Sequence, residues 1–472
     1  MSHPTRRNLL KLATAASALA ATGAIPALVE SAFADGAAPA TGGTPATAKT
    51  LPWKNWSGGQ HCEPAARAAP ASVDELASLI QKTPTPIRGV GAGHSFSALV
   101  PTDGTIVTLD RIAGVENADV KTGEADVWAG TRLSRMGDEL AKLGLAFANM
   151  PDINKQSLAG AISTSTHGTG ANIGSLSTFM RELELVTADG KVVTCSATKN
   201  SELFSAARVS VGSLGLITKA RVSARPVYKL KRKVWVEPVE DMLDKLPAYE
   251  TENRNFEFYY VPFSGLAMGI SNNETDEPET PAPLNEDDDA LRQLKMLQDW
   301  LGWSPTARRW AIQKAFADYP VETRVDFSHR TLSNERGVRF NEMEYHLPRE
   351  KAAPALREII KIIETNNIRV FFPIEFRTVA EDDIWLSPFY GRKSASIAVH
   401  QFYEWDYHYY FSQVEPVFRK HEGRPHWGKL NTLKAKDFAA IYPKWNEFLA
   451  LRKEMDPTGK FLTPYMKSVF GV

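Results

Sequence analysis

The sequence predicts an α+β fold for the part of the chain that follows its first 50 residues. Short apolar runs alternate with amphipathic stretches from about residue 51 to 226, and strand patterns rich in aromatic and β-branched residues dominate from about residue 234 to 400. Helices and strands are mixed in both halves, which favours the α+β class. The length of 472 residues is enough for two domains and a large core.

Composition excludes some classes of protein. The chain is 43% hydrophobic and 23% charged, which is ordinary for a soluble globular protein. Because 55 basic residues balance 55 acidic ones, no positive field is available for binding nucleic acid or an anionic membrane. We expect a small-molecule partner and no nucleic acid.

Residues 1–34 have the pattern of an export signal. Arg6 and Arg7 are the paired arginines of a twin-arginine signal, an alanine-rich apolar run follows at about residues 12–24, and residues 32–34 read Ala-Phe-Ala, a cleavage site. The apolar run is too short to span a bilayer comfortably. The alternative is an uncleaved amphipathic anchor.

The twin-arginine route carries folded proteins, which fits a chain whose cofactor is inserted in the cytoplasm. We therefore predict a periplasmic or secreted bacterial protein that starts near Asp35 and keeps no stable membrane insertion after cleavage. Residues 35–50 are a flexible linker by composition.

Cysteine and histidine patterns indicate no metal site. Cys62 and Cys195 are the two cysteines of the chain. A single disulfide between them is the alternative, but we expect two buried, unpaired cysteine side chains. Neither C-x-x-C nor H-x-x-x-H spacing occurs among the ten histidines and two cysteines.

The elements of the first half follow in order from local signals. A helix begins at Ser72, which forms a capping box with Glu75. Residues 134–143 repeat the amphipathic pattern, and residues 183–194 read as a hairpin that turns at Ala-Asp-Gly. Residues 203–217 complete this half.

The second half is dominated by strand patterns. An acidic, proline-rich stretch at residues 272–289 predicts a solvated surface loop. Residues 291–316 read as helical, with Trp300, Trp303 and Trp310 packed in the core, and residues 355–364 read as an amphipathic helix. Strands are expected at residues 234–236, 256–261, 343–348, 370–374 and 395–400.

Residues 87–97 are the most informative segment for function. Three glycines within five positions let the backbone approach a ligand closely and turn its amides toward an anion. A Rossmann fingerprint would lead into a helix. Here Pro101 and the strand-like residues 105–109 follow instead, so we interpret the segment as a cofactor cradle of another kind, against the alternative of a plain turn.

A second such segment spans residues 157–170. Its 14 residues are small and hydroxylated and carry no acidic or basic side chain other than His167. The alternative is a tight loop in which hydroxyls satisfy turn amides. Uncharged hydroxyls and backbone donors favour a dry pocket that holds a polar ligand.

These two segments resemble the two flavin loops of the vanillyl-alcohol-oxidase-type (PCMH) FAD domain. Residues 423–429, Gly-Arg-Pro-His-Trp-Gly-Lys, resemble a signature of the aldonolactone oxidase and alditol oxidase branch, and Glu375-Phe376-Arg377 is similar to its substrate-binding Glu-x-Arg. The four matches occur in family order across nearly the whole mature chain.

The resemblance implies an architecture and a cofactor. We expect a two-subdomain FAD-binding domain at residues 51–227, a substrate (cap) domain at 228–415 with a large antiparallel sheet flanked by helices, and a C-terminal segment at 416–472 that returns to the flavin. The implied FAD-binding residues are Arg88, Gly89, Val90, Gly91, Ala92, Gly93, His94, Ser95, Ser157, Gly160, Thr166, His167, Gly168, Thr169 and Ile217.

His94 is the sharpest of these predictions. In relatives the histidine of Gly-His-Ser bonds covalently to the flavin 8α-methyl, so the resemblance implies FAD attached through His94, with a fixed cofactor of raised potential. Without the family, a loop histidine that is hydrogen-bonded to backbone would be the better interpretation.

Glu375 and Arg377 have i, i+2 spacing on a strand, so both point to one face. An exposed ion pair is the alternative, but the apolar residues around them indicate a face near the core. By resemblance both grip the reacting oxygen of the substrate, and Lys429 reaches flavin and substrate, as a base or as an electrostatic stabiliser. His426 is a further predicted catalytic residue, and Thr108 and His400 are predicted to contact substrate.

The implied function is oxidation of an alcohol carbon of a sugar-derived aldonolactone, with hydride passing to flavin N5. Phe402 replaces a hydroxyl that alditol oxidases tend to carry and favours a lactone. Val107 lies where oxidases usually have Gly or Ala, which favours a periplasmic electron acceptor other than, or besides, O2. The alternatives are an alditol oxidase producing H2O2 and a periplasmic sugar-binding protein without redox activity.

Overall fold

The computed structural model describes residues 51–84, 86–280, 286–334 and 337–472. The predicted export signal and linker lie outside these described residues. Among the described residues, no helix combines the length and the apolar character that a membrane crossing requires.

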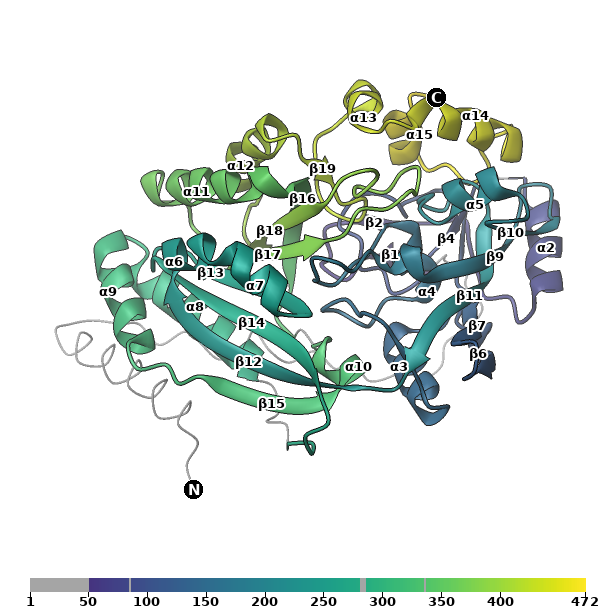
Figure 1. Cartoon of the computed structure of the whole chain (residues 1–472). Helices are drawn as coiled ribbons and strands as arrows, with labels where there is room; N and C mark the ends of the chain where they lie inside the picture. The colour runs from purple at the N-terminus through teal and green to yellow at the C-terminus, as the bar shows by residue number, and fades with distance from the viewer. Residues whose placement is uncertain (1–50, 85, 281–285, 335–336) are drawn as a thin grey trace, which may run out of the picture.

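The N-terminal half, in purple and blue in Figure 1, is built on short sheets. Its strands are β1 (Trp53–Lys54), β2 (His61–Cys62), β3 (Ala66–Ala68), β4 (Ile87–Gly89), β5 (Thr105–Val107), β6 (Ala113–Asp119), β7 (Glu124–Ala129), β8 (Leu145–Phe147), β9 (Met180–Val186), β10 (Val192–Ser196) and β11 (Leu216–Pro226). A parallel sheet has the order β3-β5-β4, and a larger antiparallel sheet has the order β10-β9-β11-β7-β6 with β8 paired to β11. These form two subdomains, and β9 with β10 is the predicted hairpin.

The helix predicted after Ser72 begins where the sequence predicts, whereas part of the predicted loop at residues 157–170 is helical. In α2 (Val73–Lys82) the Ser72 hydroxyl accepts from the Glu75 N–H at 3.1 Å, and the Glu75 carboxylate accepts from the Ala71 N–H at 2.7 Å. The Ser72 N-cap confirms the predicted start, but the predicted capping box is only half formed, because Glu75 bonds the Ala71 N–H and not that of Ser72. The other helical segments are α3 (Leu133–Lys142), α4 (Leu158–Ser163), the 3-10 turn η1 (Leu176–Phe179) and α5 (Ser201–Ala207).

The second half is organised by an eight-stranded antiparallel sheet, which we call the cap sheet. Its strands are β12 (Lys229–Pro238), β13 (Asn255–Val261), β14 (Leu266–Thr275), β15 (Glu322–Phe327), β16 (Phe340–Pro348), β17 (Ile374–Val379), β18 (Ser394–Phe402) and β19 (Arg424–Pro425). Their order is β15-β12-β14-β13-β17-β18-β16-β19. The predicted α+β class, with a large antiparallel sheet flanked by helices, is confirmed.

The two faces of the cap sheet differ in chemistry because side chains alternate along each strand. On the outer face Tyr345 stacks on Phe418 at a centroid distance of 4.9 Å, and Phe258 stacks on Phe376 at 4.7 Å. The inner face, toward the N-terminal half, carries the charged residues described below. The covering helices are α6 (Val239–Asp244), α7 (Leu246–Glu252), α10 (Ser328–Thr331), α11 (Arg349–Thr365) and α12 (His408–Lys420), and Figure 1 shows α6, α7, α11 and α12 along one side of the sheet.

The prediction that three tryptophans pack in the core is wrong. The segment forms two helices, α8 (Glu286–Leu301) and α9 (Pro305–Phe316), whose buried contacts come from Leu297, Ala311 and Ile312. Each helix has one buried face, and the tryptophans fall on the opposite faces or in the intervening turn. Trp300, Trp303 and Trp310 are 46%, 79% and 55% exposed.

Other local predictions need smaller corrections. The acidic stretch is not one loop, because residues 272–275 belong to β14 and residues 286–289 to α8, while residues 281–285 lie outside the described residues. The strand expected from residue 370 starts only at Ile374, since Pro373 has no N–H for a ladder. Cys195 is buried as predicted, whereas Cys62 is half-buried, and both are free thiols.

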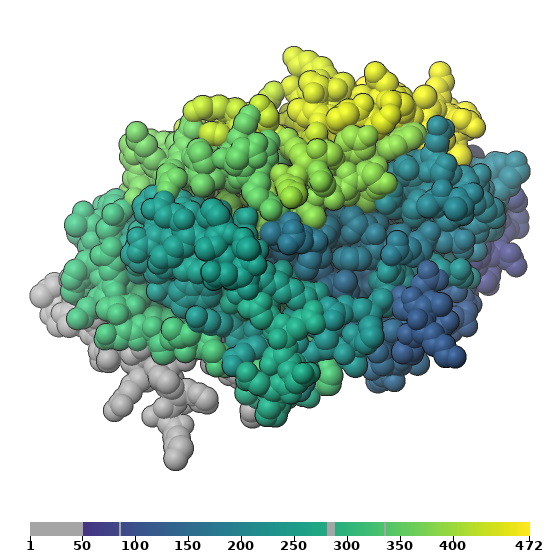
Figure 2. All heavy atoms as spheres, in the orientation of Figure 1, coloured from purple at the N-terminus to yellow at the C-terminus, as the bar shows by residue number. Residues whose placement is uncertain are grey.

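The C-terminal segment contains α13 (Ala435–Ile441), α14 (Trp445–Met455) and α15 (Pro464–Phe470) and returns to the N-terminal half. The Ile87 N–H of β4 donates to Lys460 O at 2.8 Å, and Lys460 Nζ donates to Ile80 O at 2.8 Å. Figure 2 shows these yellow atoms along one edge of the molecule, beside both green and blue regions. The domain boundaries expected at residues 227 and 415 stay predictions.

Candidate active site

A cavity lies in the N-terminal half where β4, α4 and the start of β11 meet. Its empty volume is about 1030 Å³, including the part that opens to solvent. Of the predicted cofactor residues, the whole stretch 88–95 lines it, as do Ser157, Gly160 and Ile217. The structure thus brings together the first predicted loop and the beginning of the second one.

Glycines in this cradle are required by close packing. A Cβ on Gly91 would lie 2.1 Å from Ser157 Oγ, and a Cβ on Gly89 would lie 2.8 Å from Leu216 Cδ2. Gly93 has φ +68°, a left-handed conformation that other residues rarely adopt. The loop therefore lies directly on the N-terminus of α4, where backbone N–H groups favour an anion such as a pyrophosphate.

Arg88 ties the cradle to the turn that precedes β11. Its guanidinium donates to Val211 O at 2.6 Å and to Gly212 O at 3.2 Å. Burial lowers the pKa of Arg88 to about 10. The side chain therefore stabilises one wall of the cavity through backbone carbonyls.

His94 presents an unpaired ring nitrogen beside the cavity. Its Nδ1 is buried and has no hydrogen-bond partner among the described residues, and the Trp56 ring lies 5.1 Å away. Burial, with the positive charges of Lys429 and Arg132, lowers the pKa of His94 to about 4. The imidazole is therefore neutral near pH 7 and keeps a lone pair. This orphaned nitrogen and the glycine cradle both fit an FAD held here.

The rest of the second predicted loop lies elsewhere. Thr166, His167, Gly168 and Thr169 are absent from the cavity lining. Thr169 Oγ1 donates to Phe256 O and accepts from the Thr378 N–H at 3.3 Å. His167 and Thr169 join the N-terminal half to the cap sheet, and contact with a coenzyme stays a prediction for all four residues.

Glu375 and Arg377 lie on the inner face of the cap sheet, at the same-face positions that their spacing predicts. Arg377 Nη2 donates to Glu344 Oε1 at 2.7 Å and lies 3.2 Å from Glu375 Oε2, whereas its buried Nε has no partner among the described residues. The Tyr259 hydroxyl donates to Glu375 Oε1 at 2.7 Å. Burial alone would lower the pKa of Arg377, but the two carboxylates outweigh it and raise that pKa.

Lys429 reaches the same face from the C-terminal segment. Its ammonium pairs with Glu342 Oε2 and lies 5.0 Å from the centroid of the Phe96 ring, next to the His94 loop. His400 Nε2 lies 3.6 Å from Glu342 Oε1. Burial raises the pKa of Glu342, but the positive charge of Lys429 and the neighbouring imidazole of His400 outweigh this and lower it to about 2.

His426 lies behind this group. Its Nδ1 accepts from the Gly428 N–H at 3.0 Å, and burial lowers its pKa to about 3, so the ring is neutral. Thr108 does not line the cavity, and its N–H donates to Ala68 O at 3.0 Å. The structure therefore places Glu375, Arg377, Lys429 and His400 near one another, with His426 behind them and Thr108 apart.

Sequence reasoning missed several members of this face. Glu342, Glu344 and His346 occupy alternate positions of β16, and Glu257 lies opposite Arg377 in β13. Burial and the charge of Glu375 raise the pKa of Glu257 to about 7. Polar residues at every second position of an otherwise apolar strand were the signal that could have revealed the β16 group.

Two of these groups place histidine and carboxylate atoms within 4.8 Å of one another, as a metal site would: His167 with Glu344 and His346, and Glu342 with Glu375 and His400. In the first group the Arg377 guanidinium contacts the Glu344 carboxylate. In the second group the Lys429 ammonium contacts the Glu342 carboxylate. A cationic side chain against each carboxylate opposes the binding of a second cation.

Comparisons with known proteins agree with this geometry. A family model described as D-arabinono-1,4-lactone oxidase matches residues 220–469, and one described as an FAD binding domain matches residues 64–196. The chain is 34% identical over 428 residues to L-gulono-1,4-lactone dehydrogenase of Mycobacterium tuberculosis, covering 89% of this chain and 99% of that protein. It is 30% identical over 439 residues to L-gulonolactone oxidase of Bos taurus, with the same coverage.

A solved structure supports the fold. A solvent-stable cholesterol oxidase superposes with a TM-score of 0.74 at 18% identity, covering 89% of this chain and 97% of that one. At this identity the likeness concerns the fold alone. The family matches and the 34% identical relative show that the chain belongs to the D-arabinono-1,4-lactone oxidase family of FAD-dependent oxidoreductases, whose flavin domain is of the vanillyl-alcohol-oxidase (PCMH) type.

Proposed function

We propose that this protein oxidises an alcohol carbon of a sugar-derived aldonolactone and passes the electrons to an acceptor other than, or besides, O2. The observation that carries the proposal is the convergence of Glu375, Arg377 and Lys429 on one buried face next to the His94 loop. The named activities of the relatives, a lactone dehydrogenase and a lactone oxidase, support the same chemistry.

The polar side chains divide the work of binding and orienting the substrate. The free Nε–H of Arg377 is a donor for the reacting oxygen, and the Glu375 carboxylate is an acceptor for a substrate hydroxyl. Because both groups are buried and held by neighbours, they orient a polyhydroxylated ring with little further loss of freedom. Bound FAD supplies the hydride acceptor.

His400 is the residue we assign to proton removal. Its Nδ1 lies 3.3 Å from Pro373 O, a carbonyl that can only accept, so Nδ1 carries a hydrogen and Nε2 is the nitrogen that would take the proton. Glu342, ionised and near Nε2, would stabilise the imidazolium that forms. Lys429 pairs with the same Glu342 carboxylate, and this contact favours an electrostatic role for Lys429 over the role of a base.

We also propose that FAD is attached through His94. The support is the neutral ring and its unpaired buried nitrogen at the cavity. Acid-precipitated wild-type protein should keep its yellow colour in the pellet, whereas H94A should release the colour to the supernatant. Loss of all colour from the wild-type pellet would contradict the covalent bond.

The proposal that electrons pass to an acceptor other than, or besides, O2 is based on Val107. This residue is fully buried in β5 and lines the cavity. A branched side chain narrows the path that O2 would take. V107A should raise H2O2 production in air relative to dye reduction, and an unchanged ratio would remove Val107 from the argument.

We also propose that the protein is exported, so its electron acceptor would be a periplasmic carrier. N-terminal sequencing of the exported protein should find a mature chain that starts near Asp35.

The function is tested with purified protein and a panel of aldonolactones and alditols. We expect a flavin absorption spectrum, and reduction of an artificial acceptor faster with a lactone than with any alditol. Phe402, buried two residues after His400, supports this order because it offers no hydrogen bond to an open-chain polyol. Faster turnover of an alditol would favour the alditol oxidase, and protein without flavin would favour a binding protein.

A further inference from the structure

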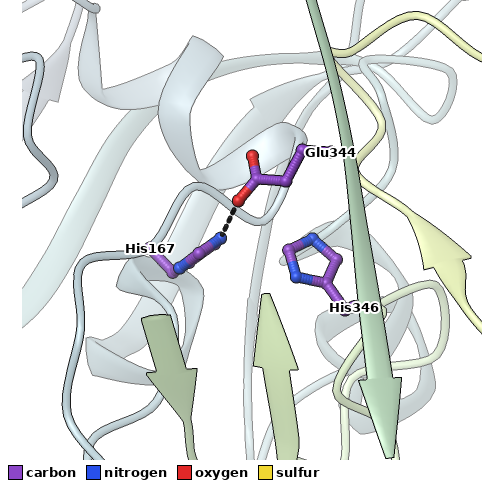
Figure 3. A group of neighbouring side chains, drawn as sticks. All are labelled: His167, Glu344 and His346. Carbon is purple, nitrogen blue, oxygen red and sulfur yellow. Dashed lines mark hydrogen bonds and ion pairs between the residues drawn. The ribbon is translucent and has the colours of Figure 1, made fainter. Parts of the chain in front are cut away.

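His167 belongs to a buried cluster behind the residues assigned to catalysis. Figure 3 shows the His167 ring directed at Glu344, with His346 beside them. His167 comes from the loop after α4, and Glu344 and His346 come from β16. His167, Glu344 and His346 are at most 2% exposed.

The hydrogen bonds of His167 fix its protonation state. Its Nδ1 lies 2.8 Å from Gly168 O, a carbonyl that can only accept, so Nδ1 carries a hydrogen. Its Nε2 lies 3.0 Å from Glu344 Oε1. In a neutral ring with hydrogen on Nδ1, Nε2 would have to accept, and Glu344 Oε1 would have to donate.

Glu344 Oε1 cannot donate, because other donors already face it. Arg377 Nη2 donates to this oxygen at 2.7 Å, and the Ser396 hydroxyl donates to it as well. Even a protonated Glu344 would carry its hydrogen on Oε2, and Nε2 of His167 would still face an acceptor. Both ring nitrogens of His167 therefore carry hydrogens.

The charges of the surrounding groups agree with a cation at this position. The carboxylates of Glu344 and Glu375 share the single guanidinium of Arg377, and Glu257 faces the same guanidinium, so the surrounding charges favour a second cation. Two more histidines face the ring, His346 at a centroid distance of 4.9 Å and His426 at 6.1 Å. Burial lowers the pKa of both His346 and His426, and His426 Nδ1 accepts a hydrogen bond, so both rings are neutral.

We propose that His167 is held as an imidazolium and is a positioning residue for Arg377. When His167 is protonated, its positive charge offsets part of the negative charge of Glu344, so Arg377 is not needed for that alone. The Arg377 guanidinium therefore keeps its contact with Glu375 and its free Nε–H. Without that proton, Glu344 draws Arg377 away from Glu375 and from the substrate. This role rests on the proposed function of Arg377, whereas the protonation state does not.

The protonation state is tested directly by NMR of protein labelled with ¹⁵N in its histidine rings. We expect one histidine, absent from the spectrum of H167Q, whose two ring nitrogens are both protonated throughout the neutral pH range. A ring with a single protonated nitrogen at position 167 would overturn the proposal. Because no substrate is needed, this result is independent of whether the protein oxidises lactones.

The positioning role is tested with H167Q, E344Q and the double variant, each checked for flavin content and thermal stability. Glutamine keeps a donor toward Glu344 but no charge, so H167Q should lower kcat/KM with the preferred lactone by about tenfold or more. The double variant should be more active than H167Q, because it removes the unbalanced carboxylate together with the cation. H329Q is the matched control, since His329 is also buried and lies 3.3 Å from a carboxylate, that of Asp138, on α3.

Either of two results would overturn the positioning role. A double variant no more active than H167Q would indicate only a packing role for the pair. A similar loss in H329Q would indicate a general effect of removing a buried histidine. If the wild-type protein contains a stoichiometric metal ion that H167Q lacks, the cluster is a metal site and the whole proposal is wrong.

Discussion

Lys429 is the residue whose removal should harm turnover most directly. It pairs with Glu342 on the inner face of the cap sheet and lies beside the loop of His94. K429M keeps the length of the side chain but leaves a buried carboxylate without its ammonium partner. We expect kcat to fall by about 10²-fold or more, as is typical for a lost electrostatic group.

The measurement is steady-state reduction of an artificial acceptor by the preferred lactone. K436M, which changes an exposed lysine of α13, is the control and should match the wild type. An unchanged kcat in K429M would remove Lys429 from the mechanism.

Glu257 should make the stability of the protein depend on pH. Its carboxyl group faces Glu375, Asp152, Arg232 and Arg377, and burial with the charge of Glu375 raises its pKa to about 7, from an ordinary value of 4.5. Below pH 4.5 the group is protonated in both the folded and the unfolded chain. As pH rises toward 7, the unfolded chain ionises first, so the stability of the wild type falls, by at most about 1.4 kcal/mol per pH unit.

E257Q removes this dependence. Its free energy of unfolding relative to wild type should rise between pH 5 and pH 7 and then level off, as measured by denaturant unfolding at several pH values. E63Q, at an exposed position, should show no such trend. A constant difference between E257Q and wild type across this range would show that Glu257 titrates normally.

At the scale of elements, the contact between the glycine loop and α4 decides whether the cofactor cradle can form. A Cβ on Gly91 would lie 2.1 Å from Ser157 Oγ and 2.9 Å from Ser157 Cβ. G91A should therefore push the loop from the helix and greatly reduce flavin content, measured by the ratio of flavin to protein absorbance. G91A/S157G removes both contacting atoms and should regain flavin.

S157G alone is the control, because it loses the N-cap of α4 but leaves the loop in place. If G91A/S157G carried no more flavin than G91A, the steric contact would not be the cause. A flavin content of G91A equal to that of wild type would contradict the close packing itself.

Local signals predicted most of the elements, and the exceptions have identifiable causes. The Ser72 N-cap of α2 and the β9–β10 hairpin depend on neighbouring residues and were predicted correctly. The three exposed tryptophans were not, because which face of α8 and α9 is buried depends on the distant partners that cover it. The same limit hid Glu342 and Glu344, whose role depends on Lys429 and Arg377 from other segments.

At the scale of the whole molecule, the last helices should unfold together with the β3-β5-β4 sheet and α2. The Lys460 carbonyl accepts from the Ile87 N–H of β4, and the Lys460 ammonium donates to Ile80 O of α2. K460M removes the ammonium contact, which should cost about 1 kcal/mol. Flavin fluorescence and far-UV circular dichroism should then show one shared transition at a lower Tm.

K453M, on the exposed side of α14, is the comparison and should leave Tm unchanged. Two separate transitions in K460M would show that the C-terminal segment unfolds independently of the FAD side. An equal loss of Tm in both variants would show that the Lys460 contact is not specific.

The sequence by itself determined the family, the glycine-rich loop at residues 88–95 that lines the cavity, and the same-face placement of Glu375 and Arg377, because these depend on motifs and on the period of a strand. Only the tertiary structure decided which partners those residues meet. The proton on His167, the pairing of Lys429 with Glu342 and the raised pKa of Glu257 arise where segments far apart in the chain bury charges together. Burial strengthens such interactions and depends on the whole fold, so local sequence carries no record of it.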